Sequence, residues 1–303
     1  MNLKENLSNT TSKKMSIQNT LKWGVTLLTA FLATPTLSAD LGLCKFSTET
    51  MQFRGTTVDQ TNCLLRKVKP QGAGSTAQKI PKWLLDNVGR DTSITPKQMS
   101  TFLITNRIQP SHVGGIVSHV DLTRARYFVI HDTSSPAFAT FPADINDSTW
   151  SGNDLHSFKT REIAKKINIV TNRVGESMTL QDLSTERQSP ATKLEESGVA
   201  PKSKNYFIHV ENVQPREKPA GSWPWVAPTP GFTPPQINRL ALIYVVSSVR
   251  AGHWLTPAYH FNIDSRATSR EPHDDPQGFN LDDWITAVSS IVTNINSKQE
   301  SGL

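Results

Sequence analysis

The chain has 303 residues, with 32 basic and 26 acidic side chains and a formal charge of +6. The first 39 residues contribute +3 of that charge, so the remainder is only weakly basic and we expect no nucleic-acid partner. About 264 residues follow position 39, enough for one large domain with or without a small extension.

Residues 1–39 have the order of a secretory signal peptide. Lysines precede the apolar run 23–32, and residues 36–39 look like a cleavage site. The run is too short for an ordinary membrane span. We therefore expect an exported protein, periplasmic or secreted, that contacts the membrane only during export. The sequence Leu41-Gly-Leu-Cys44 leaves a lipid anchor as an alternative.

The only two cysteines, Cys44 and Cys63, both follow the signal peptide. An even number of cysteines in an oxidising compartment predicts one disulfide between them. Closing this short loop stabilises a fold by about 3 kcal/mol. A zinc site at the two cysteines is the weaker alternative, because no histidine lies near either one. We predict that residues 40–110 form an accessory segment containing this disulfide.

Two helices are predicted within the accessory segment. Apolar residues between positions 80 and 88 have helical spacing. Thr95-Pro-Lys-Gln98 is a capping box that opens a second helix, with Met99, Phe102 and Leu103 on its buried side.

Three apolar runs predict strands, at residues 127–130, 167–170 and 205–211. The first run is continuous and partly β-branched, as in a central strand that is covered on both faces. His131 then lies at its carboxyl end, where the functional groups of a layered α/β sheet emerge. We predict an α/β fold with a mixed central sheet flanked by helices, in a domain that spans residues 111–296.

The carboxyl-terminal part begins with a loop. Residues 213–235 are rich in proline, which predicts irregular structure. Thr233-Pro-Pro-Gln236 is a capping box with proline at the first helical position. The helix that it opens can end at Gly252.

The last elements are a strand and a helix. Residues 258–264 alternate between apolar and polar side chains, which predicts a strand. Asn280 is a cap for a final helix with one apolar stripe. Residues 297–303 have the character of a frayed tail.

The residues that carry chemistry are two histidines and one aspartate. His131, His260 and either Asp274 or Asp275 give a His-His-carboxylate set, which leaves the fourth position of a tetrahedral zinc ion open for water. His253 is a rival to His260, but it falls at a helix end, where histidine often serves the helix dipole. We favour Asp275 because the following proline restricts it to extended geometry.

The order of these segments resembles a known family. Asp275-Pro-Gln-Gly-Phe279, followed by Asp282-Asp-Trp284, is similar to the last motif of zinc-dependent N-acetylmuramoyl-L-alanine amidases, the type shared by phage amidases, bacterial wall-recycling amidases and peptidoglycan-recognition proteins. The resemblance runs from about Tyr127 to Trp284. It implies zinc held by His131, His260 and Asp275, and peptidoglycan or muropeptides as partners.

The resemblance also implies roles for other residues. Glu211 stands where the family has its catalytic glutamate, and His273 where it has a polar group beside the reacting carbonyl. Asn168 takes the place of a tyrosine or histidine that contacts the substrate. Trp223 and Trp225 either stack on sugar rings or fasten their loop to the body of the protein.

The implied activity is hydrolysis of the amide between N-acetylmuramic acid and L-alanine. Two alternatives stay open. Some members of the family that lack a zinc ligand only bind muropeptides, and a zinc peptidase could cut a different cell-wall amide. The presence of all three ligand residues favours an enzyme over a binding module.

Overall fold

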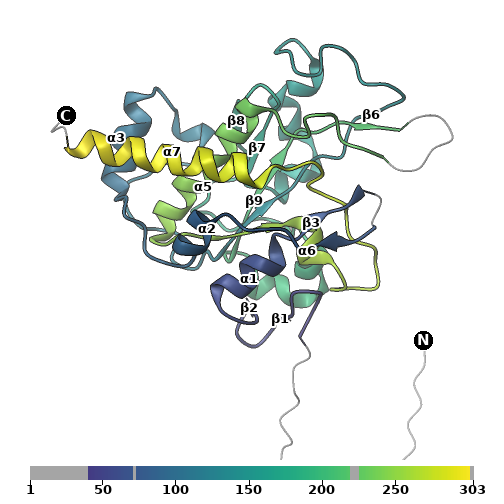
Figure 1. Cartoon of the computed structure of the whole chain (residues 1–303), viewed down its shortest axis with the longest axis horizontal. Coiled ribbons are helices and arrows are strands. Elements are labelled where there is room, and N and C mark those ends of the chain that lie inside the picture. The colour runs from purple at the N-terminus through teal and green to yellow at the C-terminus, as the bar shows by residue number, and fades with distance from the viewer. Residues whose placement is uncertain (1–39, 71–72, 219–224, 301–303) are drawn as a thin grey trace, which may run out of the picture. The chain divides into compact units, whose positions relative to one another are not determined.

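The computed structural model describes residues 40–70, 73–218 and 225–300, which belong to one compact unit (Figure 1). The predicted signal peptide and Trp223 lie outside the described residues. Within these ranges, no helix has both the length and the apolar character needed to cross a membrane.

A five-stranded mixed sheet forms the centre of the fold, in the order β11-β5-β9-β7-β8. The first four strands in that order run parallel, and β8 joins the edge antiparallel to β7. This confirms the predicted α/β class and all three of the strands expected in its first part. The strands are β5 (Tyr127–Ile130), β7 (Ile169–Thr171), β8 (Ser177–Thr179), β9 (Phe207–Asn212) and β11 (Thr256–Tyr259).

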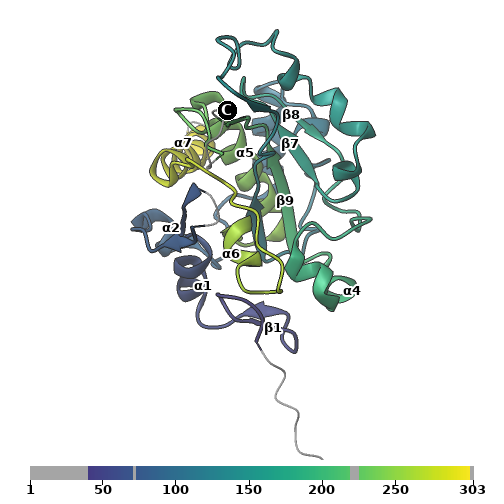
Figure 2. The same cartoon turned by 90° about the vertical axis from the view of Figure 1, so that its right-hand side faces the viewer.

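Helices cover one face of this sheet, on the same side of the strands in Figure 2. Alternate residues of the central strands, such as Phe128 and Ile130 of β5 and Val210 of β9, join the apolar core beneath them. Burying this many large apolar side chains is the main source of stability in such a layer. The helices are α2 (Lys82–Asn87), α3 (Pro96–Thr105), α5 (Pro234–Ala251) and α7 (Leu281–Glu300).

The predicted capping residues begin α3 and α5, with one difference. Thr95 and Gln98 form the full reciprocal capping box of α3. Thr233 accepts from the backbone N–H of Gln236 at the start of α5, but the Gln236 amide donates to the carbonyl oxygen of Val213. The buried neighbour therefore replaces the second half of the predicted box.

The other predicted helix boundaries are largely confirmed. Gly252 ends α5 in the left-handed conformation with φ 80°, which glycine adopts without strain. Asn280 accepts from the N–H groups of the second and third residues of α7. The helix continues to Glu300, past the expected start of the tail at residue 297.

The opposite face of the sheet is covered by the start of the described chain. Cys44 and Cys63 form the predicted disulfide, with Cα atoms 5.7 Å apart. Phe46 and Phe53 pack there against Tyr127 of β5 and its neighbours. The elements of this segment are β1 (Phe46–Ser47), β2 (Gln52–Phe53), α1 (Thr57–Leu64), β3 (Lys67–Val68) and β4 (Ser75–Thr76).

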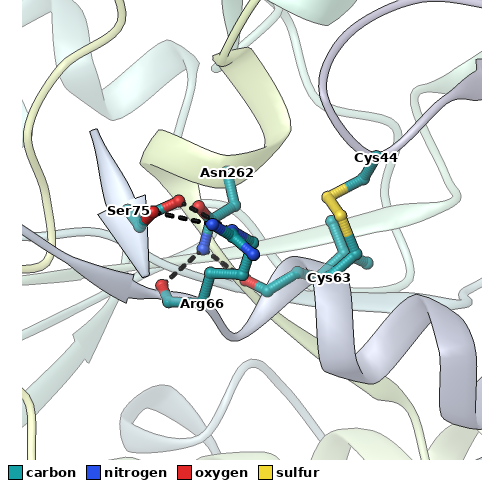
Figure 3. The surroundings of a disulfide bond; sticks show 6 residues. Cys44, Cys63, Arg66, Ser75 and Asn262 are labelled. Atoms are coloured by element: carbon teal, nitrogen blue, oxygen red, sulfur yellow. Dashed lines mark hydrogen bonds between the residues drawn. A yellow bond between two sulfur atoms is a disulfide. The ribbon is translucent and has the colours of Figure 1, made fainter. Parts of the chain in front are cut away.

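A side chain from the far end of the chain ties this segment down. Asn262 donates to the carbonyl oxygens of Leu64 and Arg66, and the Arg66 guanidinium donates to Ser75 (Figure 3). Residues of the segment also enter the helical core on the opposite face. The accessory segment thus shares both cores with the sheet, while a domain boundary at residue 110 stays a prediction.

Two further segments complete the cover of this face. The connection between β5 and β7 contributes Trp150, Leu155 and Phe158, which pack on Val170 of β7. Its elements are β6 (Ala137–Phe138), which pairs with β10 (Arg216–Glu217), and the short helices η3 (Ser151–Asn153), η4 (Leu155–Thr160) and η5 (Glu162–Lys165). The second segment is η6 (Glu195–Val199) with α4 (Ala200–Ser203), and η2 (Pro110–His112) lies beside β8.

The predicted strand at residues 258–264 is wrong beyond Tyr259. The chain turns there into the helix α6 (His260–Asp264). Phe261 and Ile263 are buried in two different cores, on different sides of this helical turn. Apolar residues at every second position therefore reflect burial on several sides here, although the same spacing is typical of a strand. The helical turn brings Asp264 under His260.

Candidate metal centre

Strand register sets His260, His131 and Glu211 side by side. The last residues of β11 and β5 pair with each other, and Ile130 of β5 pairs with Val210 of β9. His260, His131 and Glu211 are the residues that directly follow these paired positions. Neighbouring strands are about 4.8 Å apart, so three segments distant in sequence converge at the carboxyl edge of the sheet.

Asp275 completes a cluster with the two histidines. Ligand atoms of His131, His260 and Asp275 all lie within 4.8 Å of one another, and all three residues are buried. The Nδ1 atom of His131 is 3.8 Å from Oδ2 of Asp275, and Nδ1 of His260 is 3.0 Å from Oδ1. The structure therefore brings together the three residues that the sequence assigned to a metal.

The second nitrogen of His131 contacts another buried histidine. Its Nε2 atom lies 2.8 Å from Nδ1 of His209, and Nε2 of His209 lies 3.2 Å from Oε2 of Glu195. Arg187 donates to the other oxygen of that carboxylate. Burial lowers the pKa of His131 well below its ordinary value, so its ring is neutral, as a metal ligand must be.

The second nitrogen of His260 contacts a carboxylate. Its Nε2 atom lies 2.9 Å from Oδ2 of Asp264. Burial lowers the pKa of His260, but the carboxylates of Asp275 and Asp264 together raise it well above its ordinary value. In the metal-free state a proton on Nδ1 thus takes the place next to Asp275 that a cation would occupy.

These residues fit a divalent metal ion. Two imidazole nitrogens and a carboxylate are a donor set of catalytic zinc sites, and three protein ligands leave one position open. The outer nitrogen of each ring is held by a further side chain, as is usual for ligating histidines. The donor set does not by itself identify the metal.

A buried ion pair positions the Asp275 loop. Asp132, directly after His131, donates its backbone N–H to Oδ2 of Asp275. Its own carboxylate accepts from Arg216 at 2.6 and 2.7 Å and from the backbone N–H of Gln277. The strand end and the motif at residues 275–279 are therefore locked together.

Glu211 is a buried carboxylate beside the cluster. Burial and the negative charges of Asp275 and Asp132 raise its pKa well above its ordinary value. Among the described residues, none donates a hydrogen bond to its side chain. A carboxylate with a raised pKa and no fixed donor is suited to exchanging protons at neutral pH.

His273 lies at the outer side of the cluster. Its ring centroid is 5.4 Å from that of His260, and its side chain is exposed to solvent. Partial desolvation of the ring, with His260 nearby, lowers the pKa of His273. This direction favours a neutral ring, which can donate one N–H.

The remaining predicted binding residues lie outside the cluster. Asn168 is buried directly before β7, at the amino end of that strand, and its Oδ1 accepts from the backbone N–H of His209. Trp225 is half-buried, and its carbonyl oxygen accepts from the side chain of Gln277. Their roles in substrate binding stay predictions.

The rival ligands are placed elsewhere. His253 follows the end of α5, with Nδ1 3.1 Å from the carbonyl oxygen of Ala251. The Asp274 carboxylate accepts from the side chain of Gln277. Neither belongs to the cluster of three ligand residues.

Sequence reasoning missed most of the residues that support the ligands. His209 shares a strand face with Glu211, which is a visible signal for a place near the site. Asp264 is four residues after His260, a signal that the strand interpretation concealed. The contacts of Glu195 with His209 and of Arg216 with Asp132 join segments that are distant in sequence, so no local pattern indicates them.

No family model, curated protein or solved structure matches the chain. The class that the fold and the cluster define is therefore a mixed α/β protein with a candidate metal centre at the carboxyl edge of its sheet.

Proposed function

We propose that the protein is a zinc-dependent amidase that hydrolyses the bond between N-acetylmuramic acid and L-alanine in peptidoglycan. The observation that supports this most is the position of Glu211 next to the cluster of His131, His260 and Asp275. The substrate comes from the motif resemblance, and the buried cluster supplies a consistent chemistry.

Zinc held by the three ligands would act as a Lewis acid and lower the pKa of water at its open position to about 7. The chain's own groups then set the proton transfers. Glu211 accepts the proton of the attacking water on its carboxylate and donates it to the departing amine nitrogen. The negative charges of Asp275 and Asp132 increase its basicity for the first step.

His273 is the residue that we assign to the reacting carbonyl. It lies at the solvent side of His260, where a substrate would approach. A ring N–H directed at the carbonyl oxygen would stabilise the negative charge that develops there. The buried ion pair of Asp132 and Arg216 holds the loop after Asp275 through the backbone N–H of Gln277.

Two variants test the proposal in the mature protein acting on purified sacculi, with product masses and bound metal as readouts. Glu211→Gln should keep stoichiometric zinc and lose turnover by about 10²- to 10⁴-fold, because only the proton acceptor is removed. Asp275→Ala should lose both zinc and turnover, as should wild-type protein treated with chelator.

Other outcomes contradict the proposal in separate ways. Full turnover in Glu211→Gln removes that residue from the mechanism. Products that retain the muramoyl–alanine bond but are cut elsewhere identify a peptidase. Wild-type protein that binds muropeptides without zinc and without turnover identifies a binding module.

A further inference from the structure

The turn at residues 191–195 supports two carboxylates that reach both metal-binding histidines. The backbone N–H groups of Ala191 and Thr192 donate to Oε2 of Glu195. The next two N–H groups along the chain, of residues 193 and 194, donate to the two oxygens of Asp264 at 2.9 and 3.0 Å. Four successive backbone donors thus hold two acceptors side by side beneath the sheet.

The surroundings of Glu195 fix the proton on His209. Every polar neighbour of that carboxylate is a donor: Arg187, the two backbone N–H groups and the Thr192 hydroxyl. The carboxylate is therefore an acceptor only. Nε2 of His209 lies 3.2 Å away but outside hydrogen-bond geometry, and a hydrogen on it avoids placing a bare lone pair against the carboxylate.

The proton position on His209 fixes that on His131. In a neutral ring with a hydrogen on Nε2, Nδ1 is an acceptor. The 2.8 Å contact between Nδ1 of His209 and Nε2 of His131 then requires a hydrogen on the latter. Nδ1 of His131 is left with its lone pair, and it is this atom that faces Asp275.

The same reasoning applies to His260 in one step. Asp264 accepts two backbone N–H groups and is an acceptor for Nε2 of His260 at 2.9 Å. Asp275 faces Nδ1 at 3.0 Å, so a metal ion that takes the lone pair of Nδ1 and the Asp275 carboxylate leaves the hydrogen of the neutral ring on Nε2. Both histidines present the same atom to the cluster, for the same reason.

We propose that Glu195 and Asp264, held by the turn at 191–195, are positioning residues that make Nδ1 the ligating atom of both histidines, with His209 extending the support to His131. This inference rests on the proposed metal centre. It assigns a role to a buried chain of polar groups. In a purely structural core, well-packed apolar side chains of similar volume are often as stable as such a chain.

The wild-type protein allows a direct test without mutation. Two-bond ¹H–¹⁵N spectra of the zinc-loaded, ¹⁵N-labelled protein report which nitrogen of each histidine carries hydrogen. We expect hydrogen on Nε2 and metal on Nδ1 for both His131 and His260. A spectrum with Nδ1 protonated in either ring overturns the inference.

A pair of variants at one position tests the support for His131. His209→Leu replaces the acceptor ring by an apolar side chain that still fills part of the space. Zinc affinity should then fall about 10- to 100-fold in a competition titration with a chromophoric chelator. His209→Asn puts an amide oxygen near the place of Nδ1, so it should restore affinity to within a few-fold of the wild type. Urea unfolding of both metal-free variants separates this effect from misfolding.

The outcomes also separate this inference from the proposed function. If the wild-type protein binds zinc and His209→Leu binds it with the same affinity, only the positioning role is overturned. Wild-type protein that binds no stoichiometric zinc overturns the metal centre, and the positioning role falls with it.

Discussion

The two faces of the central sheet are built from alternate residues of the same strands, yet they differ in chemistry. On the helical face, β5 and β9 contribute Phe128, Ile130 and Val210 to a continuous apolar core. On the other face, His131 directly follows β5, and Glu211 is the last but one residue of β9. The helical face buries a continuous apolar core, whereas the other face, called the polar face below, combines apolar clusters around Tyr127 and Val170 with ionisable groups that are costly to bury.

This difference teaches where stability and function reside in the molecule. The apolar face requires only volume and shape, so its residues can be exchanged within limits. The polar face requires particular atoms at particular distances, and each buried polar group there needs a partner. We therefore expect substitutions on the two faces to change different measurable quantities.

The largest effect on stability is expected on the helical face. Trp254 is buried and packs against Trp83 and Tyr244. Trp254→Ala should lower the free energy of unfolding by about 3–5 kcal/mol through lost burial and the cavity left behind. Zinc affinity, measured at a temperature where the variant is folded, should stay at the wild-type value. A parallel loss of affinity would show that the two faces are coupled.

The polar face should instead give a dependence of stability on pH. Burial lowers the pKa of His209 to about 4, below the ordinary value of 6.5. As pH falls, the unfolded chain takes up this proton first, so stability present above pH 6.5 is lost progressively down to pH 4. The loss amounts to about 3 kcal/mol in the metal-free protein.

Urea unfolding of chelator-treated protein across this pH range checks the expectation. His209→Leu is the control, because it removes this titrating group and should flatten the curve by the same amount. Equal slopes in the two proteins would mean that His209 does not titrate between the folded and unfolded states.

The parts of the molecule that could be predicted from the sequence are those specified by local chemistry. The apolar run of β5 and the caps at Thr95 and Asn280 depend on neighbouring residues, and they were found. The disulfide followed from an even cysteine count. The three residues of the candidate metal cluster were predicted from a motif and from the positions of strand ends.

The remainder depends on contacts between distant segments. Register between β11, β5 and β9 brings the site residues level, and no local pattern specifies register between strands that are far apart in sequence. The same holds for the partnership of His209 with Glu195 and Arg187. The two-residue strands at the start of the described chain are too short to show any periodicity.

The cover of the polar face offers a third test. It is fastened by the Cys44–Cys63 disulfide, whereas the helical face has no covalent link among the described residues. Replacing both cysteines by serine should lower the free energy of unfolding by about 3 kcal/mol, mainly by freeing the unfolded chain. Zinc affinity should change little, because no ligand comes from this segment.

Unfolding in urea and zinc titration of the double variant check this expectation. The wild-type protein in a reducing agent, which leaves the sequence unchanged, is the matched control. A large loss of affinity in both would show that the cover supports the metal centre as well as the fold.

The smallest expected effect on stability is at the start of α7, which joins the helical face to the segment that carries Asp275. Asn280 caps α7, five residues after the ligand Asp275. Asn280→Ala should lower the free energy of unfolding by about 1 kcal/mol, the usual value of an N-cap. Thr95→Ala, which removes the cap of α3 far from the site in sequence, is the matched control and should give a similar loss.

Zinc affinity distinguishes the two cap variants if the faces are coupled. Asp275 is fixed by the backbone N–H of Asp132 and by contact with His260, and the loop after it by Gln277. These contacts hold the ligand independently of the first turn of α7, so both variants should bind zinc as the wild type does. Weaker binding in Asn280→Ala alone would mean that the helical face positions Asp275 through the chain between them.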